Sequence, residues 1–284
     1  MQHLAETVLG IALVAYAAST LAYLAYATFL RRVGAGLAAC ALLWIGFGFH
    51  TAFQVQRVLD YWHLHHEFYL PTASLFEAMS YSAWMTILVY LLSEPRMKTR
   101  LFGSAVAGVC TLLLGYGMLS AGALAPRPLM PALKSPWLNI HVTAMMLAYS
   151  GLLIGSVVAV FYLLRLRGVR WVEKLFGTLT MEEQDSLAYK FVLFAFPLLT
   201  AGIITGAIWA DKAWGRFWGW DPKETWSLIT WLIWAGYLHT RIALGWRGAR
   251  SAWFAVAGII SVFVTFLGVN YLISLFNVTS LHSY

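Results

Sequence analysis

Charge is scarce in this sequence. Only 11% of its 284 residues are Asp, Glu, Lys or Arg, whereas 61% are hydrophobic. So few charges, together with apolar runs about as long as a bilayer is thick, exclude an ordinary soluble domain. Because such runs recur along the whole chain, we expect an all-α, polytopic integral membrane protein.

Acidic residues are the scarcer charge: 12 against 19 basic residues, a formal net charge of +7. A basic excess can indicate a nucleic-acid partner, but here the basic residues form short clusters between apolar runs. That placement is typical of the cytoplasmic loops of membrane proteins. A nucleic-acid partner is therefore not needed to explain the charge.

Cysteine is almost absent. Cys40 and Cys110 each lie within an apolar run, with no second thiol nearby in the sequence. We interpret them as small core residues, with a reactive or disulfide role as the alternative. Neither is expected on the outer face of the membrane, which excludes capture of a ligand there through a protein thiol.

The apolar runs predict eight membrane-spanning helices. The first is too long for the hydrophobic region of a signal peptide and ends at Arg31-Arg32, so we interpret it as a span. Polar segments are expected at residues 54–71 and from residue 165 to about 187. The expected spans are residues 7–30, 34–53, 72–93, 101–119, 136–164, 189–210, 222–244 and 251–276.

The basic clusters predict the orientation. They mark every second connection, at residues 31–32, 96–100, 165–174 and 247–250, which we therefore place in the cytoplasm. Both termini and the 54–71, 121–135 and 211–221 connections then lie on the outer side. Lys212, Arg216 and Lys223 run against the rule, but the inner loops hold the denser clusters.

A tryptophan-rich stretch, WGRFWGWDPKETW, occupies residues 214–226, and seven of the 14 tryptophans fall between Trp209 and Trp234. Asp221 is a suitable helix N-cap, Pro222 suits the first helical position, and Glu224 completes a capping box. An interfacial aromatic belt is one interpretation. The density of rings beside a helix start favours the other, a platform for a flat macrocycle.

Two histidines are expected at the level of this loop. His141 follows the helix start at Ser135-Pro136 by about one and a half turns, and His282 follows the last span. Each alone is explained by an interfacial histidine. Together with the loop, the two histidines predict a haem site, because a pair of imidazoles is a common way to hold haem iron.

His239 lies 18 residues after Asp221, about 27 Å along the same helix, near the inner side. Ionisable groups within spans are costly and usually functional, and Ala235 and Gly236 predict a shallow face for a planar ligand. The alternative is that His239 and Arg241 reach towards the inner interface.

Other polar residues carry weaker signals. His50 is either a second ligand or a buried polar residue, and Glu77 is expected to bond a neighbouring span. His63, His65 and His66 lack a completing carboxylate or thiol, so a dedicated metal site is not expected. The small residues at positions 202 and 206 predict a helix-packing face.

These motifs resemble one family closely. The run FPLLTAGIITGAIWADKAWGRFWGWDPKETWSLITWLIWAGYLHTR, residues 196–241, is similar to the WWD segment of haem-handling proteins. Its Asp-Pro-Lys-Glu-Thr-Trp sequence resembles the CcsA (ResC) branch of System II cytochrome c maturation. SPWLNIHVTAMMLAYSGLL and the terminal LHSY match the same family, and PTASLFEAMSYSAW resembles its third block, with Ser74 and Phe76 in place of Asn and Tyr.

The resemblance implies roles for individual residues. His141 and His282 match the ligands of an external haem, and His239 matches a transmembrane haem ligand whose opposite ligand lies on a CcsB (ResB) partner. It also implies one transmembrane domain, residues 1–284, with a haem-handling segment at 196–245. The platform and cofactor-binding residues that we predict beside the histidines are Trp214, Trp218, Trp220, Asp221 and Trp226.

The implied function is export of haem b and its presentation to an apocytochrome c CxxCH motif for thioether attachment. The expected setting is the bacterial cytoplasmic membrane, with the site facing the periplasm, the partner subunit alongside, and thioredoxin-like thiol reductants acting indirectly. No catalytic side chain is predicted, only placement. A HemX-like haem-binding accessory protein is the first alternative. A small-solute transporter is the second, although the internal repeats typical of that class are not seen.

Overall fold

The computed structural model describes residues 2–30, 33–66, 68–119, 129–169, 179–269 and 271. Within these ranges the chain is helical, with eight α-helices and no β-strand. In the described part of the chain, six helical segments are long and apolar enough to cross a bilayer, and Phe102–Met118 is a shorter apolar helix. The expected span 222–244 is not among the six. These features confirm an all-α, polytopic integral membrane protein. The orientation of the termini stays a prediction.

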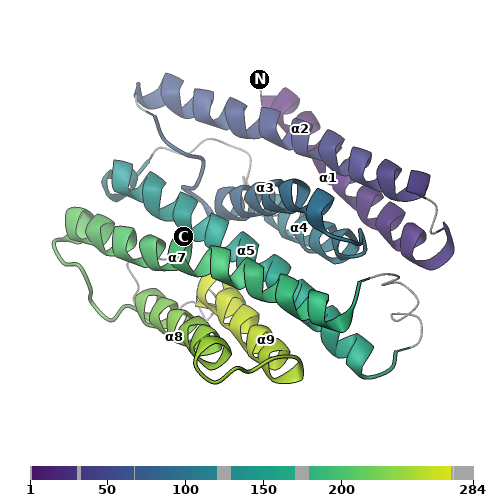
Figure 1. Ribbon diagram of the computed structural model, residues 1–284. Helices are drawn as coiled ribbons and strands as arrows, with labels where there is room; N and C mark the ends of the chain where they lie inside the picture. Colours follow the sequence, from purple (N-terminus) through teal and green to yellow (C-terminus); the bar gives the residue numbers. More distant parts are fainter. Residues whose placement is uncertain are drawn as a thin grey trace. The chain divides into compact units, whose positions relative to one another are not determined.

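The helices group into two compact units, one with α1 to α4 and one with α5, α7, α8 and α9 (Figure 1). Whether the two act as the single domain expected from the sequence stays a prediction. The first unit comprises α1 (Gln2–Ala25), α2 (Val33–His65), α3 (Leu75–Ser93) and α4 (Phe102–Met118); the second comprises α5 (Pro136–Leu166), α7 (Met181–Trp214), α8 (Pro222–Ile242) and α9 (Ala249–Phe263).

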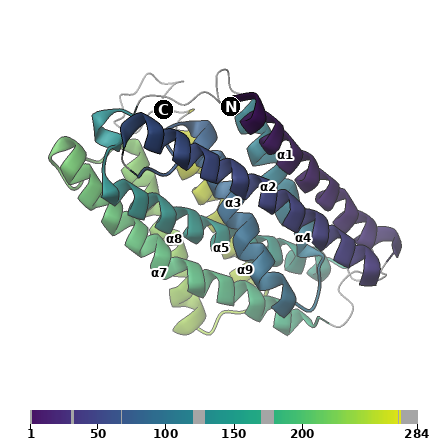
Figure 2. The ribbon, with the colours of Figure 1, turned by 90° about the horizontal axis from the view of Figure 1, so that it is seen from above.

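In each unit, helices that follow one another along the chain pack side by side, as α1 and α2 do in Figure 2, and the first helix of the unit also packs against the last. In the first unit α1 packs against α2 and α4, and α3 packs against the same two helices. In the second, α5 packs against α7 and α9, and α8 packs against the same two. Short connections between helices favour such antiparallel neighbours.

The structure corrects the expected polar segment 54–71. Helix α2 continues to His65, about three turns beyond the expected end of the second span. The polar residues there are not loop residues, because Gln54 and Arg57 are buried and face partners in α3. A similar correction applies to α7, which begins at Met181 rather than residue 189, with a capping box between Thr180 and Glu183.

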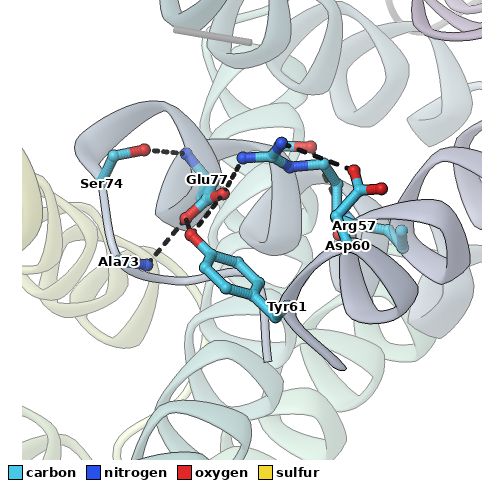
Figure 3. A network of polar contacts seen from close by, with 8 residues as sticks. Arg57, Asp60, Tyr61, Ala73, Ser74 and Glu77 are labelled. Atoms are coloured by element: carbon cyan, nitrogen blue, oxygen red, sulfur yellow. Dashed lines mark hydrogen bonds and ion pairs between the residues drawn. The ribbon is translucent and has the colours of Figure 1, made fainter. Parts of the chain in front are cut away.

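Glu77 has the role expected of it, a bond to a neighbouring span (Figure 3). Its carboxylate pairs with the guanidinium of Arg57, which is only 2% exposed, and accepts hydrogen bonds from Tyr61 Oη at 3.0 Å and the Ala73 amide at 2.9 Å. Ser74 is the N-cap of α3, its hydroxyl accepting from the Glu77 amide. The buried charges are therefore paired and hydrogen-bonded, as burial requires.

His50 is a buried polar residue. It is fully buried, its Nε2 lies 2.9 Å from Ser80 Oγ, and its Nδ1 lies 3.1 Å from Tyr16 Oη. Both ring nitrogens are thus engaged inside the first unit, which decides between the two interpretations of this residue. Cys110 is buried and Cys40 half-buried, and neither forms a disulfide.

The second unit is held at one end by a buried ion pair. Arg241 of α8 donates to both carboxylate oxygens of Asp185 in α7, at 2.8 and 2.6 Å, and Asp185 also accepts from the Gly248 amide before α9 at 2.9 Å. One carboxylate therefore fixes three helix ends. This is the end of α8 that carries His239.

Candidate functional site

The tryptophan-rich loop is short and bounded by two strong helix signals. Helix α7 ends at Trp214, where Gly215 takes a left-handed φ of 74° and its amide bonds Asp211. Helix α8 begins at Pro222, with Asp221 as N-cap and the expected capping box to Glu224. The loop is therefore only residues 215–221, with both ends fixed.

Trp218 and Trp220 form one aromatic group in this loop. Their rings meet edge to face, with centroids 5.8 Å apart and an interplanar angle of 89°. Trp220 is 68% exposed, so a large ring stands at the surface with a second ring beside it. Edge-to-face pairs of this kind are favourable beyond the area they bury.

His141 belongs to a second aromatic group. Its ring stacks on Trp209 of α7 at 6.2 Å between centroids and 12° between planes, and Trp209 meets Trp214 edge to face at 4.8 Å. The indole of Trp209 donates to the Ala132 carbonyl at 2.8 Å. This arrangement brings His141 together with Trp214, two of the residues predicted from the sequence.

The orientation of the His141 ring is fixed by α7. His141 Nδ1 lies 2.7 Å from the Gly202 carbonyl. Since a carbonyl only accepts, Nδ1 carries the proton in this bond, and in the neutral imidazole the lone pair is then on Nε2. A β-carbon at Gly206 would lie 2.6 Å from Nδ1, so this position has room only for glycine. The expected packing face at residues 202 and 206 is confirmed, and it also seats the histidine.

Trp226 is half-buried in the first turns of α8, and its carbonyl accepts a hydrogen bond from Thr265 Oγ1 at 3.1 Å. Asp221 is 7% exposed and its Oδ1 accepts from the Lys223 amide at 2.9 Å. Asp221 therefore acts through the backbone of the helix start. His282 lies outside the described residues.

His239 is far from this loop. It lies in the last turn of α8, at the opposite end of the helix from Asp221, and its side chain is exposed. The expected shallow face beside it is partly wrong, because Gly236 is turned towards α9, where an added β-carbon would lie 3.3 Å from the ring of Phe254. Leu232 and Ile242 are exposed with His239 at seven- and three-residue spacing, and they mark the outward face of α8.

The histidine group at residues 63–66 is described in part, since the side chain of His65 lies outside the described residues. His63 and His66 are exposed at the end of α2 and in the turn after it. Among the residues that the structure describes, no three His, Cys, Asp or Glu side chains form a group that could hold a metal ion.

The comparison with known families decides the assignment. A family model described as cytochrome C assembly protein matches residues 72–276, which is more than half of the chain. The chain belongs to the cytochrome c assembly protein family. The matched range starts just before α3 and includes the whole tryptophan-rich loop, His141 and His239, whereas α1 and α2 precede it.

The sequences of individual relatives support the same family assignment. The cytochrome c biogenesis protein CcsA of Guillardia theta is 39% identical over 224 residues, covering 72% of this chain and 74% of its own. CcsA of Gloeobacter violaceus is 35% identical over 318 residues, covering 90% of this chain and 87% of its own. The family expected from the sequence motifs is thereby confirmed.

A solved structure shares the fold. The cytochrome c haem lyase CcmF superposes with a TM-score of 0.71 over 93% of this chain, at 21% sequence identity. This chain spans only 46% of the CcmF chain, so the likeness is one of fold.

Three features of the site could not be recognised as part of it from the sequence: Trp209, Gly206 and the backbone at Trp220. Trp209 and Gly206 follow His141's acceptor, Gly202, on one face of α7, at spacings of seven and four residues. That spacing was the available signal. Trp220 has a φ of 57°, which no local motif predicts for a bulky residue.

Proposed function

We propose that this cytochrome c assembly protein handles haem b and presents it on the outer face of the bacterial cytoplasmic membrane for covalent attachment to apocytochrome c. A CcsB (ResB) type subunit is its proposed partner. The haem is cargo, and the polypeptide supplies the position at which it is held.

The observation that supports this function most strongly is the seating of His141. Histidines that bind metals commonly donate their second ring N–H to a carbonyl or carboxylate, which sets the tautomer and the ring orientation. His141 does so at 2.7 Å to Gly202, while Trp209 lies flat against its ring. The Nε2 lone pair thus suits an axial iron ligand, with His282 as the proposed second ligand.

The tryptophan loop suits the rest of the macrocycle. Trp214, Trp218 and Trp220 offer aromatic faces and edges, and the capping box at Asp221 holds the backbone beside Trp220. Trp226, half-buried in the first turns of α8, is proposed as a further aromatic contact. The role proposed for these side chains is placement of the haem rather than side-chain chemistry.

The chemistry needs no further oxidant or reductant. Each CxxCH thiol adds across one haem vinyl group: sulfur bonds one vinyl carbon, and the thiol proton goes to the other. The thiols have to be reduced, which is where thioredoxin-like reductants act indirectly. Holding vinyl and thiol at contact in fixed geometry is worth up to about 7–11 kcal/mol in ideal cases.

His239 is proposed as one ligand of a separate haem position nearer the inner side. It lies on the outward face of α8 rather than inside the unit. An exposed ligand on a membrane helix suits a haem shared with a neighbouring subunit. The opposite ligand would then come from the CcsB (ResB) type partner.

A reconstitution assay separates ligation from simple haem binding. The chain and its partner are expressed with a CxxCH apocytochrome in a host without its own maturation machinery. We expect covalent haem, which stays with the cytochrome after denaturing electrophoresis, and its loss in His141→Ala. Bound haem without covalent product would instead indicate an accessory protein of the HemX kind. A chain that purifies without haem would refute both.

A further inference from the structure

Trp220 has an unusual backbone. Its φ of 57° places a bulky residue in the left-handed region, which glycine and asparagine normally occupy. It is also one of the most exposed large side chains in the described part of the chain, at 68%. Strained residues of this kind persist only where the surroundings hold them, and they gather at functional sites.

What holds Trp220 is the carboxylate of Glu224. The amides on either side of Trp220, those of Gly219 and Asp221, both donate to the same oxygen, Glu224 Oε2, at 2.7 and 3.1 Å. Glu224 is 9% exposed, so these bonds are shielded from water. These two hydrogen bonds fix the backbone on both sides of the strained residue.

This is more than helix capping. In a capping box the N-cap side chain accepts from the backbone of the first helical turn, and the side chain of the third helical residue accepts from the N-cap amide, here that of Asp221. The capping box of α7 has that reach-back bond, from the Thr180 amide to Glu183 at 3.0 Å. The additional bond to Gly219, two residues before the cap, reaches past Trp220 into the loop.

We propose that Glu224 is a positioning residue that fixes Trp220 in its left-handed conformation and so preorganises the aromatic group of Trp218 and Trp220 for a planar macrocycle. The proposal rests on the proposed function for the identity of the ligand. Glu224 acts only through the backbone. Because the ring is set before the ligand arrives, binding loses less conformational freedom.

The backbone role is tested by hydrogen exchange on the purified protein in nanodiscs, without added haem. Glu224→Ala removes the acceptor, whereas Glu224→Gln keeps one carbonyl oxygen that can take both bonds. We expect exchange in peptides covering 219–221 to accelerate at least roughly tenfold in the alanine variant and to stay within roughly threefold of wild type in the glutamine variant. Glu183→Ala is the matched control, since it opens a capping box but leaves this loop intact.

The ligand role is tested by haem titration of the same variants with their partner subunit. We expect Glu224→Ala to weaken haem retention roughly tenfold and Glu224→Gln to retain it. In a Trp220→Gly background, where glycine adopts the left-handed conformation unaided, Glu224→Ala should cause little further loss.

The outcomes are separable. Unchanged exchange in Glu224→Ala would overturn the positioning role. Faster exchange with undiminished haem retention would overturn the link between this backbone and the ligand. If the wild-type protein retains no haem, the proposed function fails, while the exchange comparison still decides what Glu224 does.

Discussion

A single methyl group at Gly206 should disable the predicted haem ligand. An alanine β-carbon there would lie 2.6 Å from His141 Nδ1, where an ordinary contact needs about 3.4 Å or more. Either the ring turns or α5 and α7 separate by nearly 1 Å, and in both cases the 2.7 Å bond to the Gly202 carbonyl is lost. Close packing prevents the surroundings from absorbing the shift without cost.

The size of the effect follows from that bond. The bond is half-buried, and a typical intramolecular hydrogen bond contributes about 0.5–1.5 kcal/mol, or roughly 2- to 12-fold in an equilibrium constant. We therefore expect Gly206→Ala to reduce the external haem by such a factor, read from the Soret absorbance per protein, and to alter the axial-ligand bands of what remains.

The control is an alanine where a methyl group fits. At Gly108 in α4 the new carbon would make an ordinary 3.5 Å contact with Thr20, so Gly108→Ala should leave haem unchanged. Haem content and spectrum identical to wild type in a folded Gly206→Ala protein would refute the inference that α7 seats His141.

Three further results are expected. Arg57→Ala strands the buried carboxylate of Glu77 and should lower stability by about 3–5 kcal/mol, seen as a lower unfolding midpoint in detergent; an unchanged midpoint would contradict the pairing. Asp185→Ala should cost a similar amount by stranding Arg241, and the protein that still folds should keep its outer haem; selective loss of that haem would argue against separate sites. Trp209→Phe keeps an aromatic ring in α7 but loses the indole hydrogen bond, so stability should fall by about 1 kcal/mol plus the smaller ring's lost packing, and no change in thermal unfolding would contradict that bond.

The sequence predicted the helices well where apolar runs were uninterrupted. The expected bounds 101–119 and 222–244 agree with those of helices α4 and α8 within two residues, although neither helix is among the six described segments that are long and apolar enough to cross a bilayer. It failed in α2, because Arg57 is a loop residue by hydropathy and a core residue once Glu77 is opposite it. A hydropathy profile scores each residue by itself, so it does not register an ion-pair partner that only the fold brings close.

The candidate site was predictable to a similar degree. The helix start at Asp221 is local, so its capping box could be read from four consecutive residues. The seat of His141 is not local: Gly202, Gly206 and Trp209 lie more than 60 residues away. The second bond of Glu224 could not be foreseen, because it depends on a backbone conformation that tryptophan rarely adopts.

The central claim, two separate haem positions with different histidines, is tested most directly by absorption spectroscopy of purified wild-type, His141→Ala, His282→Ala and His239→Ala proteins, each alone and with the partner subunit. We expect the external haem to be lost in the first two variants and kept in His239→Ala. Equal loss in all three, with folding intact, would contradict the account.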